Sequence, residues 1–438
     1  MGEAAFGFRF YAARQLSKMC SGLIRNSWLS VPSYRCVLQS ILLNQNIETD
    51  IRYGSTIRIM IPISKPDLGL KEIGAVQDAF EEGWIALGPK VAEFEEKLEA
   101  HFNYPNVIAT NSGTSALDLA VKSLSLTGTE ILVPPITWTS TAHVVRYNDL
   151  DLGWVDVNES TLNMDPDSLR ERISDETAAV IVVHYGGQAA EIDTIVDIAR
   201  EHNTAVIEDA AHAIGTEYKG KPLGTFGDVG CFSFQESKPL TTGEGGALIT
   251  NNSDIEALAR RLSKVGVDKS NRYERTTDES GEYEWDYDVT HVGYKYFMHD
   301  VSAAIGLAQI DRFERLQQRR QMIADRYENE LGSLSWVTPL ETRQNSAHAW
   351  YNYTIRVPSA DRDNLISHLH QNNVSATVHY KPLYKHTVFN HHSPDLPQTE
   401  SVWKEMVTLP MSSALTDLQI TQVIAAVKQY DPKQLDGD

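Results

Sequence analysis

Two side chains with complementary chemistry lie close together in this 438-residue sequence. Asp209 ends an apolar run that begins at Thr204, and Lys238 stands shortly before a glycine-rich segment that ends at Gly246. A lysine amine can condense with an aldehyde, and a carboxylate can keep a pyridinium nitrogen protonated. An enzyme that uses pyridoxal phosphate (PLP) requires this pair of groups from its protein.

Each of the two residues also has a simpler explanation. An aspartate that closes a strand often caps the following helix, and a lysine in a glycine-rich loop is usually solvated. Glycines by themselves indicate only unusual backbone angles. The order of the two residues favours the chemical interpretation, because the ligands of an α/β sheet gather at the carboxyl ends of its strands.

Alternating strands and helices would position these residues. Apolar runs predict seven strands, at 106–110, 130–134, 152–155, 179–184, 205–209, 229–234 and 246–250. Helical spacing of apolar residues predicts helices at 70–86, 91–102, 115–125, 167–173 and 192–201. This alternation predicts an α/β fold with a mainly parallel sheet covered on both faces.

The chain is longer than one hydrophobic core usually supports, so we expect two domains. A charged insertion at 268–288 predicts an exposed loop, and one long helix is expected at 302–331. Beyond it, strands near 350–357 and 374–379 indicate a smaller α+β domain. We expect an extension at 1–59, a large domain at 60–300 and a small C-terminal domain at 301–438.

Short motifs occur in the order in which one enzyme family carries them. They are Gly83–Glu95, Asn111–Leu117, Asp209-Ala-Ala-His212, Phe232–Lys238, Thr241–Gly246, Gly293–Asp300 and Val378–Leu383. Together they resemble the DegT/DnrJ/StrS-type family of sugar aminotransferases, within fold-type I of the PLP enzymes. The resemblance runs from about Met60 to the C-terminal helix. It implies a seven-stranded, mainly parallel sheet in a large PLP-binding domain.

The resemblance also implies a role for each matching residue at the cofactor ring. Lys238 would hold the cofactor covalently and then move protons, and Asp209 would pair with the ring nitrogen. His212 would lie near the ring hydroxyl, and Trp138 would stack on the ring. Outside this family, such a histidine or tryptophan is equally well a structural core residue.

A phosphate site is implied where a short strand leads into a helix. Gly113, Thr114 and Ser115 would meet the phosphate at the helix N-terminus, with Ser233 as a further ligand. Ordinary helix capping explains these serines and threonines as well. Lys295 stands where the family commonly has an asparagine that reaches the phosphate of the neighbouring subunit.

The substrate contacts are less well defined by the sequence. Candidates for a local cationic or hydrogen-bonding pocket are Lys90, His379, Tyr380 and Lys381. Phe297 replaces a frequent arginine of the family. Gln235 replaces a frequent histidine, as in relatives that act on cyclic polyols.

Composition excludes several other classes of protein. The net charge of −20 argues against nucleic-acid and anionic-membrane partners. Three scattered cysteines, Cys20, Cys36 and Cys231, are too few for a disulfide framework or a four-cysteine metal site, so we expect no metal and a cytoplasmic location. Residues 1–59 carry more basic than acidic side chains, which indicates a transit peptide or a start codon assigned too early.

The function that this resemblance implies is transfer of an amino group, from glutamate, onto a keto group of a nucleotide-linked deoxyhexose. The pathway would make a surface polysaccharide or another glycoconjugate, and the enzyme would be a homodimer with shared active sites. Three alternatives remain: a PLP-dependent sugar dehydratase, a cyclitol or aminobenzoate-type relative, and a non-catalytic nucleotide-sugar-binding regulator. Retention of Lys238, which the dehydratases replace by histidine, argues against the first.

Overall fold

The computed structural model describes residues 60–267, 287–389 and 394–432. The extension at 1–59 and most of the charged insertion at 268–288 lie outside these ranges, so the expectations for both remain predictions. Among the described residues, no helix combines the length and apolarity that crossing a membrane requires. The same residues contain no cluster of three or more His, Cys, Asp or Glu side chains suited to a metal ion.

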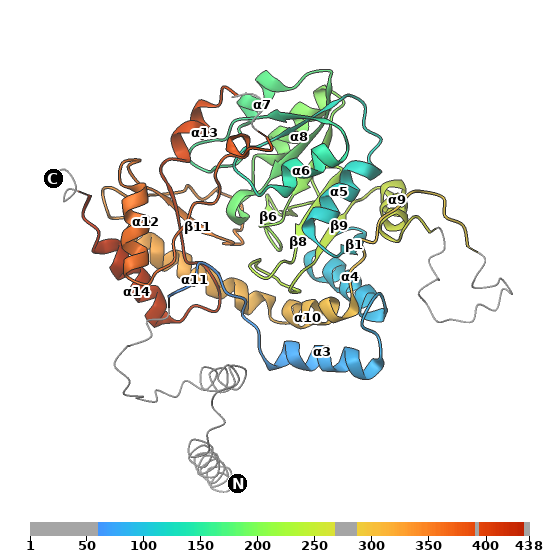
Figure 1. Cartoon of the computed structure of the whole chain (residues 1–438), viewed down its shortest axis with the longest axis horizontal. Coiled ribbons are helices and arrows are strands. Elements are labelled where there is room, and N and C mark those ends of the chain that lie inside the picture. The colour runs from blue at the N-terminus through green and yellow to red at the C-terminus, as the bar shows by residue number, and fades with distance from the viewer. Residues whose placement is uncertain (1–59, 268–286, 390–393, 433–438) are drawn as a thin grey trace, which may run out of the picture. The chain divides into compact units, whose positions relative to one another are not determined.

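One seven-stranded sheet forms the centre of the larger part of the chain (Figure 1). Its strands are β1 Val107–Thr110, β2 Glu130–Val133, β3 Asp151–Trp154, β4 Thr177–Val183, β5 Ala205–Asp209, β8 Val229–Ser233 and β9 Gly246–Ile249. They lie in the order β1-β9-β8-β5-β4-β2-β3, and β9 alone runs antiparallel to its neighbours in this sheet. The predicted α/β class, the mainly parallel sheet and all seven strands are confirmed.

Successive side chains of a buried strand point to opposite faces of the sheet. Because apolar side chains stand on both faces, helices cover both. In β4, Val180 and Val182 belong to one hydrophobic cluster, while Ala179 and Ile181 belong to another on the opposite face. A strand buried on both faces reads as a continuous apolar run, which is why β4 could be recognised in the sequence.

Seven helices belong to this part of the chain: α3 Leu70–Glu82, α4 Pro89–Phe102, α5 Gly113–Ser123, α6 Ser140–Tyr147, α7 Pro166–Arg172, α8 Ile192–Glu201 and α9 Ser253–Ser263. A 3₁₀ turn, η1 Tyr185–Gly187, and a small hairpin, β6 Glu217–Tyr218 and β7 Lys221–Pro222, complete it. The sequence did not predict α6 or α9. The start of α9 carried a recognisable signal, because the Asn252 side chain accepts hydrogen bonds from the backbone of Asp254 and Ile255.

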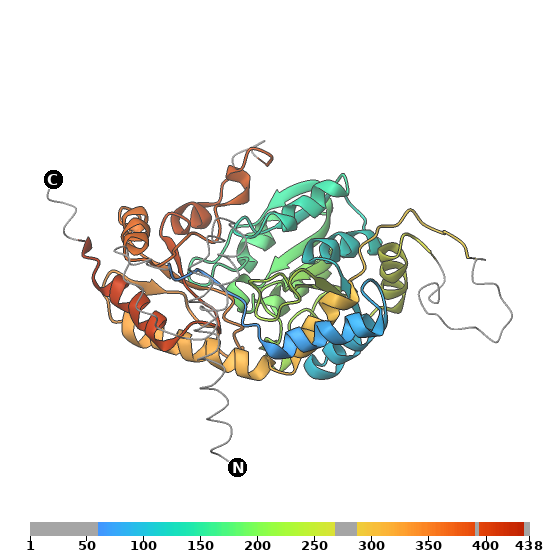
Figure 2. The ribbon, with the colours of Figure 1, turned by 60° about the horizontal axis from the view of Figure 1, so that its bottom comes forward.

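The single helix predicted at 302–331 is wrong, because the structure has two helices there, α10 Asp300–Ile310 and α11 Phe313–Leu331. Between them, Arg312 forms ion pairs with Asp67 and Glu72, both at 2.6 Å. α10 packs against α3 and α4, as both views show (Figures 1 and 2). Tertiary contacts of this kind interrupt a helix whose sequence is helical throughout.

The C-terminal part has a second hydrophobic cluster around a three-stranded sheet. Its elements are β10 Thr338–Pro339, β11 Tyr353–Arg356, α12 Arg362–Gln371, η3 Leu383–Lys385, α13 Pro397–Val402, β12 Met406–Leu409 and α14 Asp417–Lys428. The predicted strand at 350–357 corresponds to β11. The one at 374–379 is wrong, since Val374 and Thr377 make only isolated bridges, to Ile61 and Thr408.

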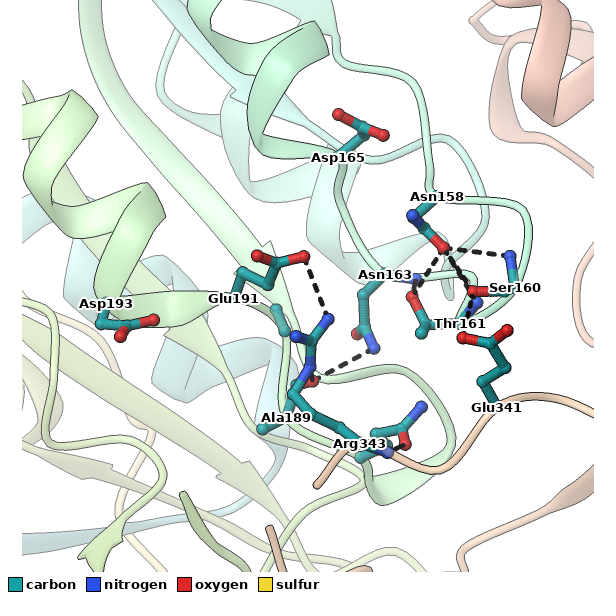
Figure 3. Close-up of polar contacts among 12 residues, drawn as sticks. Asn158, Ser160, Thr161, Asn163, Asp165, Ala189, Glu191, Asp193, Glu341 and Arg343 are labelled. Atoms are coloured by element: carbon teal, nitrogen blue, oxygen red, sulfur yellow. Dashed lines mark hydrogen bonds and ion pairs between the residues drawn. The ribbon is translucent and has the colours of Figure 1, made fainter. Parts of the chain in front are cut away.

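Polar contacts join loops of the large sheet to the segment that leads into β11 (Figure 3). Arg343 donates hydrogen bonds to the Ala189 carbonyl and to Glu191, both at 3.2 Å. The hydroxyl of Ser160 donates to Glu341 at 3.1 Å. These contacts fix the path of the chain shortly before it reaches Tyr351.

Candidate active site

A cavity of about 450 Å³ lies at the carboxyl ends of the parallel strands. Val183 ends β4, Asp209 ends β5 and Ser233 ends β8, and all three line this cavity. Its volume lies within the range of small-molecule sites, roughly 300–1,000 Å³. The structure therefore has a ligand-sized site at the edge where α/β sheets usually carry one.

Most of the site residues predicted from the sequence come together in this cavity. Those that line it are Gly113, Thr114, Trp138, Asp209, His212, Ser233, Lys238, His379 and Tyr380. They come from segments far apart in the sequence. Gln235, which departs from the family pattern, also lines the cavity.

Four other predicted residues do not line the cavity of this chain: Ser115, Lys90, Lys295 and Lys381, the last of which is exposed. Ser115 follows Thr114 in α5, and its hydroxyl donates a hydrogen bond to the Asn111 side chain at 2.6 Å. Lys90 forms an ion pair with Glu82 at 3.1 Å, which raises its pKa. Lys295 is exposed, and its Nζ lies 5.9 Å from the centre of the Phe297 ring.

One end of the cavity is suited to an anion. Gly113 and Thr114 form the first turn of α5, where backbone N–H groups lack partners within the helix. The Ser112 hydroxyl caps this helix by accepting from the Ser115 N–H at 3.1 Å. A Cβ atom at Gly113 would lie 2.8 Å from the Cβ of Ser233, so the helix start and β8 form a tight cradle.

Asp209 is 5% exposed and has two partners within the protein. It accepts hydrogen bonds from the Thr141 hydroxyl at 2.8 Å and from the Ala211 N–H at 3.2 Å. Burial raises the pKa of Asp209 above its ordinary value, although these hydrogen bonds and the charge on Lys238 oppose that effect. A buried carboxylate of this kind suits a cationic N–H group such as a pyridinium nitrogen.

Lys238 is, among the described residues, the one Lys or Arg side chain that lines the cavity. Its backbone N–H donates to the Gln235 carbonyl at 2.9 Å, which closes the turn that carries it. Its Nζ lies 4.2 Å from the centre of the Tyr351 ring. The amine and the carboxylate of Asp209 therefore share one enclosed site.

His212 lies between two tyrosines. Its ring stacks on Tyr351, with centroids 4.1 Å apart, and its Nε2 lies 3.3 Å from the Tyr380 hydroxyl. Its Nδ1 is buried without a partner in the described chain. Burial lowers the pKa of His212 well below its ordinary value, so the ring is neutral. This ring nitrogen therefore keeps an unmet hydrogen-bonding capacity in a residue that lines the cavity.

His379 is a second neutral histidine at this wall. Burial, followed by the nearby charge of Lys238, lowers its pKa to about 4. Its Nδ1 is also without a partner in the described chain. The hydroxyl of Tyr185 donates to the His379 carbonyl, which ties the wall to the end of β4.

The neutral state of His212 predicts how stability depends on pH. Its folded pKa lies below the unfolded value of about 6.5, so the unfolded chain binds more protons below that pH. The free energy of unfolding is therefore expected to fall by about 1.4 kcal/mol for each pH unit below 6.5 because of this residue alone. Urea unfolding of the wild type and of His212→Phe at several pH values measures this change in the free energy of unfolding.

His212→Phe keeps an aromatic ring against Tyr351 but does not titrate. The variant should lose less stability than the wild type as the pH falls. The matched control is His291→Asn, because His291 is an exposed histidine outside the cavity. Identical pH slopes for the wild type and His212→Phe would contradict the neutral assignment.

The sequence analysis did not identify several residues of the site. They are Thr137, Ser140, Thr141, Ser237, Glu244 and Tyr351. The position of Ser140 and Thr141 directly after Trp138 was a usable signal. Tyr351 offered none, because it stands in a segment of the smaller part of the chain.

Comparison with known proteins identifies the family. The family model of the DegT/DnrJ/EryC1/StrS aminotransferases matches residues 66–428. The spore coat polysaccharide biosynthesis protein SpsC of Bacillus subtilis is 35% identical over 380 residues, which are 84% of this chain and 96% of SpsC. The family match covers more than half of the chain and includes every residue that lines the cavity.

Solved structures agree with the family match. The sugar aminotransferase CalS13 from Micromonospora echinospora has a TM-score of 0.77 and 29% identity, covering 85% of this chain and all of that one (100%). Spr1654 from Streptococcus pneumoniae has been solved in a PLP form, with a TM-score of 0.77, 29% identity and coverage of 84% of this chain and 98% of that one. The cavity has the amine, the buried carboxylate and the anion cradle that PLP requires. The chain therefore belongs to the DegT/DnrJ/EryC1/StrS aminotransferase family and is a PLP-dependent aminotransferase.

Proposed function

We propose that this enzyme transfers an amino group from glutamate to a keto group of a nucleotide-linked deoxyhexose, in the synthesis of a polysaccharide or glycoconjugate. One observation carries the proposal: Lys238, Asp209 and the N-terminus of α5 share one cavity in a member of this family. The names of SpsC and CalS13, which refer to polysaccharide synthesis and to a sugar substrate, support the substrate class.

The cofactor, when bound, supplies an aldehyde that takes up the amino group and a ring that withdraws electrons from the neighbouring carbon. We assign the protein's contribution residue by residue. Lys238 holds the cofactor and carries the proton between carbon atoms, and Asp209 faces the ring nitrogen. Trp138 would stack on the ring, and His212 would lie near the ring hydroxyl. Both half-reactions use this one site, which gives ping-pong kinetics.

The phosphate would lie at the anion cradle formed by Gly113 and Thr114 with Ser233; Ser115, whose N–H and hydroxyl bind Ser112 and Asn111, lies outside it. These groups are neutral, so the charge of the phosphate is met mainly by the dipole of α5. Substrate contacts are assigned to His379 and Tyr380 at the cavity wall. Lys90, outside the cavity, would contact only a substrate that extends beyond it.

The tight approach of Gly113 to Ser233 yields a test of the phosphate site. Gly113→Ala should lower the affinity for PLP about tenfold or more, because an added methyl forces two backbones apart at a cost of about 1–3 kcal/mol. Gly74→Ala in α3 is the control, since no atom lies within 4 Å of its added Cβ. Equilibrium dialysis with PLP measures both, and equal affinities would refute this position for the phosphate.

We also propose a homodimer in which Lys295 of one subunit completes the phosphate site of the other. Lys295 is exposed and lies outside the cavity of its own chain. α3 exposes large apolar side chains, with Leu70 86%, Ile73 64% and Phe80 60% exposed. Apolar surface of this kind usually marks a contact with another protein.

Substitution at α3 tests the homodimer. Ile73→Asp should shift the protein towards the monomer in sedimentation velocity, because a carboxylate in an apolar interface is unpaired. Leu418→Asp in α14, where the leucine is 69% exposed, should leave the sedimentation coefficient unchanged. A wild-type protein that sediments as a monomer contradicts the proposal.

We propose two domains after an N-terminal extension, and a cytoplasmic location for the enzyme. A large domain at 60–300 and a small one at 301–438 follow an extension at 1–59. Ala303 and Leu307 of α10 and Phe313 at the start of α11 still pack into the core of the large domain, so the limit between the two cores lies later than residue 300, within α11. The scattered cysteines support a cytoplasmic location.

Absorption spectroscopy followed by product analysis tests the function. The purified protein with PLP should show a visible band that glutamate converts into the spectrum of the pyridoxamine form. A panel of nucleotide-linked keto sugars, analysed by mass spectrometry, should then yield one aminated product. A protein without the band would be a binding module, and a band that no amino donor changes would indicate elimination of a hydroxyl. Gln235 in the cavity makes keto cyclitols the second class for the panel.

A further inference from the structure

Tyr351 lies between the reactive amine and a neutral histidine. Lys238 Nζ is 4.2 Å from the centroid of its ring, and the His212 ring stacks against it at 4.1 Å with an interplanar angle of 15°. The Tyr351 hydroxyl lies 3.4 Å from the Ser237 hydroxyl, next to Lys238 in the sequence. An ammonium group within about 6 Å of an aromatic centroid is attracted by the ring.

Three neighbouring side chains of α11 hold the segment that carries Tyr351. Gln317 donates to the His348 carbonyl at 2.6 Å, and Arg320 donates to the Trp350 carbonyl at 2.9 Å. The indole of Trp350 donates to Gln321 at 2.8 Å. Arg320 is 3% exposed, so a long cationic side chain is buried in order to fix this backbone. The position of Tyr351 is therefore set by a rigid helix.

The electrostatic setting of Tyr351 differs from that of other enclosed tyrosines. Burial raises the pKa of Tyr104 and of Tyr327 above the ordinary value. For Tyr351, burial acts in the same direction, but the charge of Lys238 and side-chain hydrogen bonds with Ser237, Tyr380 and Lys238 outweigh it and lower the pKa. Lys238 and Tyr351 therefore interact strongly.

We propose that Tyr351 is a positioning residue for Lys238: its ring holds the lysine side chain in place, beside His212, whenever the amine is not attached to the cofactor. The proposal rests on the proposed role of Lys238. In a transamination the amine is released in each half-reaction and must stay within reach of the carbon that gains or loses a proton. A ring clamped by α11 provides that restraint.

The test measures the reactivity of Lys238 itself. Full-length enzyme in its pyridoxamine phosphate form is labelled with trinitrobenzenesulfonate over a pH series, and the peptide with Lys238 is quantified by mass spectrometry. Only the uncharged amine reacts. Tyr351→Leu should move half-maximal labelling to lower pH and raise the rate below that pH about five- to tenfold, the size of a lost cation–π contact. Tyr351→Phe keeps the ring but loses the hydroxyl that also contacts Lys238, and should therefore shift less than Tyr351→Leu.

Controls separate this effect from loosened structure. Tyr353→Phe removes a hydrogen bond to Glu328 in the same segment, outside the cavity, and should label like the wild type. The titratable groups that face Lys238 stay unchanged in all variants; they are Asp209, His212, His379, Tyr380 and Glu244. If Tyr351→Leu does not fold, Tyr351→Met, which fills similar space, takes its place.

Two results would overturn the proposal. One is a labelling profile of Tyr351→Leu that coincides with the profile of the wild type. The other is a higher plateau without a shift along the pH axis, because that indicates easier access alone. If the protein never forms the pyridoxamine state, the proposed function is refuted instead. In that case, labelling of the protein as purified still tests the contact between Lys238 and Tyr351.

Discussion

Lys238→Ala is expected to lower the rate of amino transfer from glutamate by about 10⁴-fold or more, because proton transfer by a positioned group alone contributes about 10²–10⁴. Lys238 is the one Lys or Arg that lines the cavity in the described part of the chain, so no other cationic side chain of the same subunit lies there to replace it. Single-turnover mixing with glutamate, followed by absorbance, measures the rate. The variant should still bind PLP, since the anion cradle and Asp209 are unchanged.

A structural readout accompanies this kinetic one. After borohydride treatment of the wild type with PLP, the peptide that contains Lys238 should carry the mass of the reduced cofactor. Lys221→Ala, at an exposed lysine of β7 outside the cavity, should keep both the labelled peptide and the rate. Substantial turnover of Lys238→Ala, or a label on another lysine, would disprove the assignment.

The sequence predicted the sheet because its signal is local. Strands such as β4 are buried on both faces and read as unbroken apolar runs. The division between α10 and α11 was not predictable in this way, since ion pairs of Arg312 with Asp67 and Glu72 connect residues far apart in the chain. The strand expected at 374–379 failed for a similar reason, because pairing partners and not propensity decide whether a short extended segment joins a sheet.

The candidate site was predictable where short motifs carry it. Asp209 and Lys238 are recognised from their neighbours in the sequence. Glu208 shows why the structure is still needed: it is as buried as Asp209, but it accepts hydrogen bonds from the N–H groups of Gly224, Phe226 and Gly227 and lies 2.9 Å from His184. Successive side chains of a strand face opposite sides, so one carboxylate supports the fold and the next lines the cavity.

Tyr351 was missed for a different reason. It reaches the cavity through contacts with α11, and no local pattern around it differs from that of a core aromatic. Thr141, which holds Asp209, likewise stands in α6, a helix that was not predicted from the sequence. Residues that orient a reactive group through tertiary contacts leave no periodic signal in the sequence.

Asp209→Asn is expected to lower the rate of amino transfer about 10³-fold with little change in fold, the loss that follows removal of one preorganised charge at a reacting centre. Asparagine has nearly the same shape: its Oδ1 can still accept from the Ala211 N–H, while its Nδ2 would donate to the Thr141 hydroxyl, which then acts as the acceptor. It lacks the negative charge that keeps a pyridinium nitrogen protonated, so the ring withdraws electrons less well. The deprotonation of glutamate's α-carbon should become rate-limiting, which a large isotope effect with α-deuterated glutamate would show.

Thr141→Val separates the charge of Asp209 from its orientation. The variant removes the 2.8 Å hydrogen bond to the carboxylate but leaves the charge in place. It should therefore cost about 10- to 100-fold in rate, of the order of one hydrogen bond to a charged group (about 1.5–3 kcal/mol). If Asp209→Asn and Thr141→Val have equal rates, orientation and not charge is what Asp209 provides. If Asp209→Asn keeps the wild-type rate, the ring nitrogen is not bound at the end of β5, and the cofactor must lie in the cavity in another orientation.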